Sequence, residues 1–161
     1  LERAGIGKGD TVAIMSPNAP AMLEAHYGVP MTGAVLNTLN VRLDAPTIAF
    51  TLDHGEAKVL LTDREFSPIV KEALAQATSK PLVIDIDDAL AIGGDLIGDT
   101  DYEAFIATGD PEFSWSLPAD EWESQAVVYT SGLRPTPGIC SSFDMPVLPS
   151  LTSGSLSSIW T

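Results

Sequence analysis

A strand, a helix and a second strand can be read in residues 58–86, KVLLTDREFSPIVKEALAQATSKPLVIDI. The apolar run at 58–62 is typical of a strand that is buried on both faces. Ser67 and Pro68 predict the start of a helix, with Ser67 as its N-cap. That helix carries one apolar stripe, made of Val70, Ala73, Leu74 and Ala77. A second apolar run follows at 81–86, so the stretch predicts a β-α-β unit.

The same alternation extends toward the N-terminus. Apolar runs at 11–15 and 33–36 predict two more strands, with a helix over 20–31 between them that Pro30 ends or kinks. Asp44 is a good N-cap for a further helix. The apolar positions of that helix are Ile48, Ala49 and Leu52.

Downstream, a short helix is predicted at 102–107 and a last strand at 126–129. Strands that alternate with helices require crossover connections, which are right-handed in nearly all proteins. We therefore predict an α/β fold with a mostly parallel sheet flanked by helices.

The chain has 161 residues and a formal net charge of −14, from 22 acidic and 8 basic side chains. This acidity rules out a nucleic-acid binder and disfavours a site on anionic lipid. The single cysteine, Cys140, cannot form a disulfide within the chain, and we assign it no role. No apolar run is long enough to span a bilayer, and the first residues lack the order of a signal peptide. We expect a cytoplasmic protein.

Composition changes twice along the chain. Residues 81–133 contain no Lys or Arg, whereas twelve acids fall in 85–123, which we interpret as a solvated acidic surface with loops. After Gly132, the last 29 residues contain seven Ser and four Pro but only two charged residues. We predict a domain over 1–132 and an unrelated, poorly ordered tail over 133–161. The absence of an initiator Met suggests a piece of a longer protein.

Acidic side chains offer no convincing metal site. Asp99, Asp101 and Glu103 have the opening spacing of a calcium loop, but Ala104 and Asp110 stand where that loop needs Gly and Glu. The acids at 85, 87 and 88 also lack a Gly at the required turn. We predict no metal ligand.

Glycines and histidines near the N-terminus offer no convincing catalytic site. The Gly-rich stretch at 5–9 lacks the spacing of a Walker loop and precedes a strand, so we interpret it as a helix C-cap and turn. His26 and His54 belong to no His/Cys cluster or nucleophile motif. We interpret both as packing or capping residues and predict no catalytic residue.

One polar motif follows a predicted strand, Tyr129-Thr130-Ser131-Gly132. Ligands of open α/β sheets bind just beyond the carboxyl ends of the strands. Hydroxyl groups and consecutive turn amides at such a place can bind phosphate oxygens. Thr130, Ser131 and Gly132 are therefore the candidate binding residues.

An ordered set of segments resembles the adenylate-forming enzymes, specifically the acyl-CoA synthetases. The set comprises Gly9-Asp10-Thr11-Val12-Ala13-Ile14, Pro17-Asn18, Gly33-Ala34-Val35, Asn37-Thr38-Leu39-Asn40-Val41-Arg42-Leu43, Ala57-Lys58-Val59-Leu60 and Tyr129-Thr130-Ser131-Gly132. It covers residues 1–132, about a quarter of a complete member, as a partial N-terminal AMP-binding domain. The Asn-Thr-Leu-Asn-x-Arg-Leu form is most similar to synthetases for medium-chain or similar small acyl substrates.

The resemblance implies a two-step reaction that uses ATP, Mg²⁺ and coenzyme A. A carboxylic acid attacks the α-phosphate of ATP to give an acyl-adenylate and pyrophosphate, and the thiol of coenzyme A then displaces AMP. In this family Thr130, Ser131 and Gly132 would belong to the loop that binds the β- and γ-phosphates, with Thr130 approaching Mg²⁺.

The resemblance stops at Gly132. The family loop continues as Ser/Thr-Thr-Gly-x-Pro-Lys-Gly, whereas this chain continues from Leu133 with only Pro137 in agreement and Gly138 in place of the loop Lys. We interpret the break as a shifted reading frame. We expect no turnover and no tight binding of ATP, Mg²⁺ or coenzyme A by the chain alone.

Two other hypotheses stay open at this point. The first is that the chain is a non-enzymatic α/β module that binds a partner or a small ligand. The second is that it is a fragment that does not fold stably, because its neighbours in the fold are missing. The sequence does not define the acyl substrate or the oligomeric state.

Overall fold

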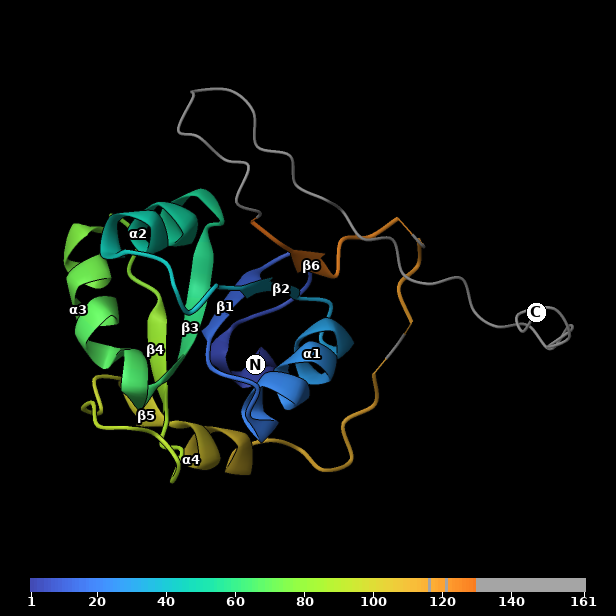
Figure 1. The fold of residues 1–161 in the computed structure, drawn as a ribbon. Helices are drawn as coiled ribbons and strands as arrows, with labels where there is room; N and C mark the ends of the chain where they lie inside the picture. The colour runs from blue at the N-terminus through green and yellow to red at the C-terminus, as the bar shows by residue number, and fades with distance from the viewer. Residues whose placement is uncertain (116, 121, 130–161) are drawn as a thin grey trace, which may run out of the picture.

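The computed structural model describes residues 1–115, 117–120 and 122–129. These residues form a six-stranded sheet in which the strand pairings are parallel, in the order β5-β4-β3-β1-β2-β6 (Figure 1). The strands are β1 Thr11–Met15, β2 Val35–Thr38, β3 Ala57–Asp63, β4 Leu82–Ile86, β5 Thr100–Asp101 and β6 Ala126–Val127. The predicted α/β class with a mostly parallel sheet is confirmed.

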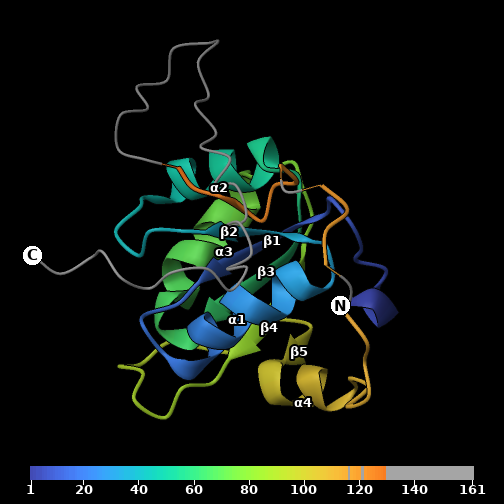
Figure 2. The same cartoon turned by 90° about the vertical axis from the view of Figure 1, so that its right-hand side faces the viewer.

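Helices cover both faces of the sheet, and Figure 2 shows α1 in front of it and α3 behind it. The helices are α1 Pro20–Met31, α2 Ala45–His54, α3 Ser67–Gln76 and α4 Tyr102–Ala107, with short 3-10 helices η1 Glu2–Ala4 and η2 Arg64–Phe66. Helices α1 and α4 pack on one face, and α2 and α3 pack on the other. The central strands are therefore buried from both sides, which explains their continuous apolar runs.

Side chains alternate between the two cores along β1. Val12 and Ile14 pack toward α1, whereas Ala13 and Met15 pack toward α2 and α3. All four side chains are fully buried. This strand is the centre of the fold because it pairs with β2 on one side and β3 on the other.

The chain changes direction along the sheet after β2. It runs from β1 to β2 over the α1 face, then crosses back past β1 to β3 over the α2 face. The second connection reverses both the direction along the sheet and the face that the chain crosses. The two crossover connections therefore have the same handedness. The connection that follows β1 crosses one face of the sheet, and the connection that follows β3 crosses the other. The place between the carboxyl ends of β1 and β3 is the topological switch point, where ligands of such sheets bind.

Strand β3 contains one extra residue, which makes a bulge opposite β1. Thr11 pairs with Ala57 and Val12 pairs with Val59, so Lys58 has no partner residue on β1. The Lys58 side chain extends outward, where its Nζ lies 2.6 Å from Oδ1 of Asp10. Bulges of this kind are found mainly in antiparallel pairs.

Two predicted details are wrong at the level of single residues. Ser67 is not the N-cap of α3: Asp63 caps η2 by accepting from Glu65 N at 2.9 Å, and Oγ of Ser67 accepts from Asp95 N at 2.8 Å. Strand β2 begins at Val35 because Gly33 closes the turn after α1, its N–H donating to Pro30 O at 2.8 Å.

Other predicted boundaries agree more closely. Asp44 caps α2 and Asp101 caps α4, each by accepting from a backbone N–H three residues later. The last strand is two residues long where four were predicted, and the two-residue β5 was not predicted. Within the described residues, no helix is long and apolar enough to cross a bilayer.

Candidate functional site

In the sequence, the candidate binding motif comes shortly after the segment that forms β6, an edge strand of the sheet. Strand β6 pairs with β2 alone, in the register Leu36 to Ala126 and Asn37 to Val127. Thr130, Ser131 and Gly132 lie outside the described residues, as does the tail over 133–161. The structure therefore describes the chain as far as Tyr129, the residue directly before Thr130.

Tyr129 is tied to the end of α2. Its hydroxyl oxygen and Nδ1 of His54 are joined by a hydrogen bond of 2.8 Å, and the two rings meet edge to face with centroids 5.9 Å apart. Phe50, one turn earlier in α2, stacks on the His54 ring with centroids 5.3 Å apart. The predicted packing role of His54 thus has a specific partner that lies 75 residues away in the sequence.

A cavity of about 370 Å³ lies beside this contact. Its walls are formed by Gly9, Asp10, Thr11, His54, Gly55, Glu56, Lys58, Val127 and Tyr129. Hydrogen bonds from Lys58 and from Gly7 N lower the pKa of Asp10, so its carboxylate stays charged and neutralises the lysine. The cavity therefore offers an ion pair and not a lone cation, and its lining gives little attraction for a polyanion such as ATP.

Asp63 ends β3 at the topological switch point. It is 1% exposed, and its Oδ2 atom is buried without a hydrogen-bond partner among the described residues. Burial raises the pKa of Asp63, and the neighbouring carboxylates Asp88 and Glu65 act in the same direction, while the hydrogen bond from Glu65 N opposes it. This is the most unfavourable environment for a carboxylate in the central sheet.

We expect Asp63→Asn to change the pH dependence of stability. Because folding raises the pKa of Asp63, its ionisation opposes folding: the cost is absent below the unfolded value of 3.8 and grows as the pH rises through the folded value. Asparagine keeps an oxygen for Glu65 N and carries no charge. The variant should match the wild type near pH 3 and exceed its free energy of unfolding near neutral pH. Urea titrations between about pH 3 and neutral pH would measure the free energy of unfolding of the variant and the wild type. A difference between the two proteins that stays constant with pH would contradict the prediction.

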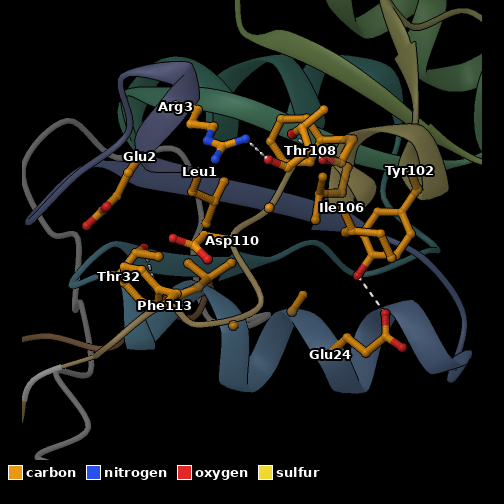
Figure 3. Close-up of a pocket in the computed structure, with 16 residues that line it drawn as sticks. Leu1, Glu2, Arg3, Glu24, Thr32, Tyr102, Ile106, Thr108, Asp110 and Phe113 are labelled. Carbon is orange, nitrogen blue, oxygen red and sulfur yellow. Dashed lines mark hydrogen bonds between the residues drawn. The ribbon is translucent and has the colours of Figure 1, made fainter.

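An apolar cavity of about 300 Å³ separates α1 from α4 and η1 (Figure 3). Tyr102 Oη donates to Glu24 Oε2 at 2.8 Å across it, and Arg3 donates to the carbonyl of Thr108. Burial, followed by Glu24, raises the pKa of Tyr102, so the phenol stays protonated. Carboxylates of Glu2, Glu24 and Asp110 line the cavity, which makes it a poor site for an anion.

The acidic segment has structural roles where it is described. Asp85 accepts from Gly98 N at 2.6 Å, Asp87 pairs with Arg64 at 2.7 Å, and Asp95 pairs with Lys71 at 3.1 Å. Asp101, from the calcium-like spacing, caps α4. No group of three His, Cys, Asp or Glu side chains in the described ranges is placed to hold a metal ion.

The remaining candidates from the sequence also have structural places. Gly5 is the C-cap of η1 in a left-handed conformation, as predicted for the Gly-rich stretch at 5–9. His26 lies exposed on α1, its Nδ1 bonded to Met22 O of the same helix at 2.7 Å. Sequence reasoning missed Asp63 and the pairing of His54 with Tyr129. The polar end of an otherwise apolar strand could have indicated Asp63, whereas no local signal indicates the His54 partner.

The parallel sheet places the chain among the α/β proteins that bind ligands at the carboxyl ends of their strands. Within that class, the family model of the AMP-binding enzymes matches residues 1–133. The chain belongs to the AMP-binding enzyme family, and the resemblance seen in the sequence is confirmed.

Two similar proteins are named as CoA ligases. The chain is 46% identical over 149 residues to the acetate/butyrate–CoA ligase AAE7, peroxisomal, of Arabidopsis thaliana, which covers 85% of this chain and 26% of that protein. It is 42% identical over 166 residues to the acetate–CoA ligase CCL3 of Humulus lupulus, covering 95% and 29%. The chain thus spans little more than a quarter of the length of these two relatives.

A solved structure shows the same fold. The Brucella canis acyl-CoA synthetase matches with a TM-score of 0.71 at 23% identity, over 91% of this chain and 25% of that one. The described sheet and its helices therefore have the fold of a quarter of that larger chain.

Proposed function

We propose that this chain is the N-terminal part of an ATP-dependent acyl-CoA synthetase that activates a small carboxylic acid. The observation that carries the proposal is the family match over residues 1–133 together with relatives that are named acetate and butyrate CoA ligases. A carboxylic acid first reacts with ATP to give an acyl-adenylate and pyrophosphate. The thiol of coenzyme A then displaces AMP and leaves the thioester.

Thr130, Ser131 and Gly132 would bind the phosphate groups of ATP. Their place in the sequence shortly after the parallel strand β6 supports this role, because sheets of this class bind ligands beyond the carboxyl ends of their strands. Arg42 lies in the turn after β2, the strand that pairs with β6, and its guanidinium has no ion-pair partner among the described residues. It is therefore a cation that could assist at the same edge.

The chain alone would not complete the reaction. Four of its cations, Lys8, Lys58, Arg64 and Lys71, already pair with carboxylates. The described residues gather no set of ligands for Mg²⁺, so they do not fit that ion. In the complete enzymes, ATP, Mg²⁺ and coenzyme A would be bound mainly by segments that this chain does not include. Residues 133–161, the proposed frame-shifted tail, would contribute nothing.

A chimera tests this function. Residues 1–132 would replace the aligned stretch of the acetate/butyrate–CoA ligase to which this chain is 46% identical. We expect the chimera to release pyrophosphate and form acyl-CoA from acetate or butyrate, and the 161-residue chain to show no turnover. A folded chimera without activity would contradict the proposal and favour a non-enzymatic α/β module. Turnover by the chain alone would refute its inactivity.

A cytoplasmic location is also proposed for the protein. The alternative is a peroxisomal location, because the names of some relatives include the word peroxisomal. A fluorescent fusion distinguishes the two compartments, because only a peroxisomal protein would accumulate in punctate organelles.

A further inference from the structure

Helix α1 is apolar on its outer face as well as on its inner face. Ala21, Ala25 and Val29 lie on the inner face and are buried against the sheet. The outer face carries larger apolar side chains, and Leu23 and Tyr27 are 63% and 67% exposed there. A surface helix normally places polar residues outward, whereas a helix that is apolar all round is typical of the interior of a large protein.

Three residues form the apolar stripe of α1: Leu23, Tyr27 and Met31. They follow one another at intervals of four residues, which brings their side chains to one side of the helix. Glu24 and His26 fall on the two flanks of the stripe at 3.6 residues per turn. Figure 2 shows α1 in front of the sheet, and the exposure of the stripe places it on the side of the helix that faces away from the sheet.

Helix α3, on the opposite face of the sheet, has the outer surface that water favours. Its exposed positions include Lys71, Glu72 and Gln76, whereas Val70 and Ala73 are buried. The chain therefore places polar side chains outward on one covering helix and apolar side chains outward on the other. Neighbouring exposed apolar side chains, unlike single ones, mark a surface for contact with protein.

The surface beside the stripe is acidic. The cavity between α1 and α4 lies along the same helix, and the carboxylates of Glu2, Glu24 and Asp110 line it (Figure 3). A covering surface that is apolar at its centre and basic at its rim would be complementary to this arrangement. A second copy of the chain is a poor match, because each copy has a net charge of −14 and the same carboxylates at the same place.

We propose that the apolar stripe of α1 is an internal interface of the complete acyl-CoA synthetase, covered by a segment of the same polypeptide that these 161 residues do not include. The inference rests on the proposed function. The two CoA ligases similar to this chain are more than three times its length, so most of such a protein lies outside the matched stretch. The covering segment presents apolar side chains to the stripe and basic side chains to the carboxylates beside it.

The first measurement compares the 161-residue chain with the chimera that carries residues 1–132 in the acetate/butyrate–CoA ligase. Leu23→Cys and Tyr27→Cys are labelled with a maleimide, and mass spectrometry quantifies the modified peptide, so that other cysteines do not interfere. Both positions should react at least about tenfold more slowly in the chimera, because labelling then requires local opening. Equal rates in the two proteins would overturn the proposal.

Ala75→Cys is the matched control for the labelling. Ala75 is an exposed position on α3, the helix with the polar outer face. Its labelling rate should differ by less than about twofold between the two proteins, because no cover is proposed there. An equal slowing at positions 23, 27 and 75 would mean a general loss of accessibility and would overturn the assignment of the interface to α1.

The second measurement replaces the stripe with neutral polar side chains. In the 161-residue chain, the double variant Leu23→Gln/Tyr27→Gln should change the melting temperature by less than about 2 °C, because both side chains are exposed. In the chimera it should lower the melting temperature by about 5 °C or more, because the polar amides would be buried. Ala75→Gln should leave both proteins unchanged within about 2 °C. Equal shifts of the double variant in both proteins would contradict the interface.

The remaining outcomes separate the occupants and the hypotheses. Sedimentation of the 161-residue chain as a monomer supports the proposal, whereas a dimer that the double variant dissociates would show that a second copy covers the stripe. A folded chimera that is inactive but slowly labelled contradicts the proposed function and supports the interface. An active chimera that is labelled as fast as the 161-residue chain overturns the interface alone.

Discussion

Replacing Ile14 with alanine is expected to lower the free energy of unfolding of this chain by about 3 to 4 kcal/mol. Ile14 is fully buried in β1, between β2 and β3, and packs into the core under α1. The loss combines the transfer of the removed methyl groups with the cavity that remains, because neighbours on two strands cannot close around it.

Leu23→Ala provides the matched control for Ile14→Ala. Leu23 is 63% exposed on the outer side of α1, so its truncation should change the free energy of unfolding by less than about 0.5 kcal/mol. Urea unfolding followed by circular dichroism would measure both variants. Equal losses would mean that β1 is not the centre of the cooperative fold.

Gly94→Ala is expected to cost about 3 kcal/mol or more, through steric overlap together with backbone strain. Gly94 has a φ of +83°, and a Cβ atom there would overlap the carbonyl oxygen of Arg64. The loop between β4 and β5 is held at this point by the pair of Arg64 with Asp87 and by a bond from Arg64 Nε to Gly93 O at 3.3 Å. The substitution should detach this loop from η2.

Gly93→Ala separates the two causes. Gly93 has nearly the same φ, +81°, but a Cβ atom there meets nothing within 4 Å. Its alanine variant should therefore cost about 1 to 2 kcal/mol, the strain of the left-handed conformation alone. Thermal unfolding of both variants would measure the difference. Identical losses would show that the overlap with Arg64 is relieved without cost.

Much of the fold was predictable because it depends on local patterns. Buried strands at β1, β3 and β4 contain short apolar runs, and caps such as Asp44 act on backbone groups three residues away. Ser67 misled the prediction because its hydroxyl bonds Asp95, a residue 28 positions later. Local rules cannot anticipate such a contact.

The candidate site was predictable only in part, for a similar reason. The family resemblance in the sequence indicated Thr130, Ser131 and Gly132, whose roles remain proposals. The pairing of His54 with Tyr129 depends on α2 and β6 meeting in space, across 75 residues. The sequence shows Asp63 as the polar end of an apolar strand, but its burial depends on the switch point, which is known only once the strand order is known.

The extra residue at Lys58 has a consequence for how related sequences can differ in length. Ala57 and Val59 are two positions apart yet belong to opposite cores, because Lys58 resets the phase of the strand. Deleting Lys58 would remove only the residue that has no partner on β1. Each side chain from Val59 to Asp63 would still face the same side of the sheet as before. Deleting a single residue later in β3 would exchange the two cores for the rest of the strand. Length variation in this strand should therefore be tolerated at one position, the one occupied by the exposed lysine.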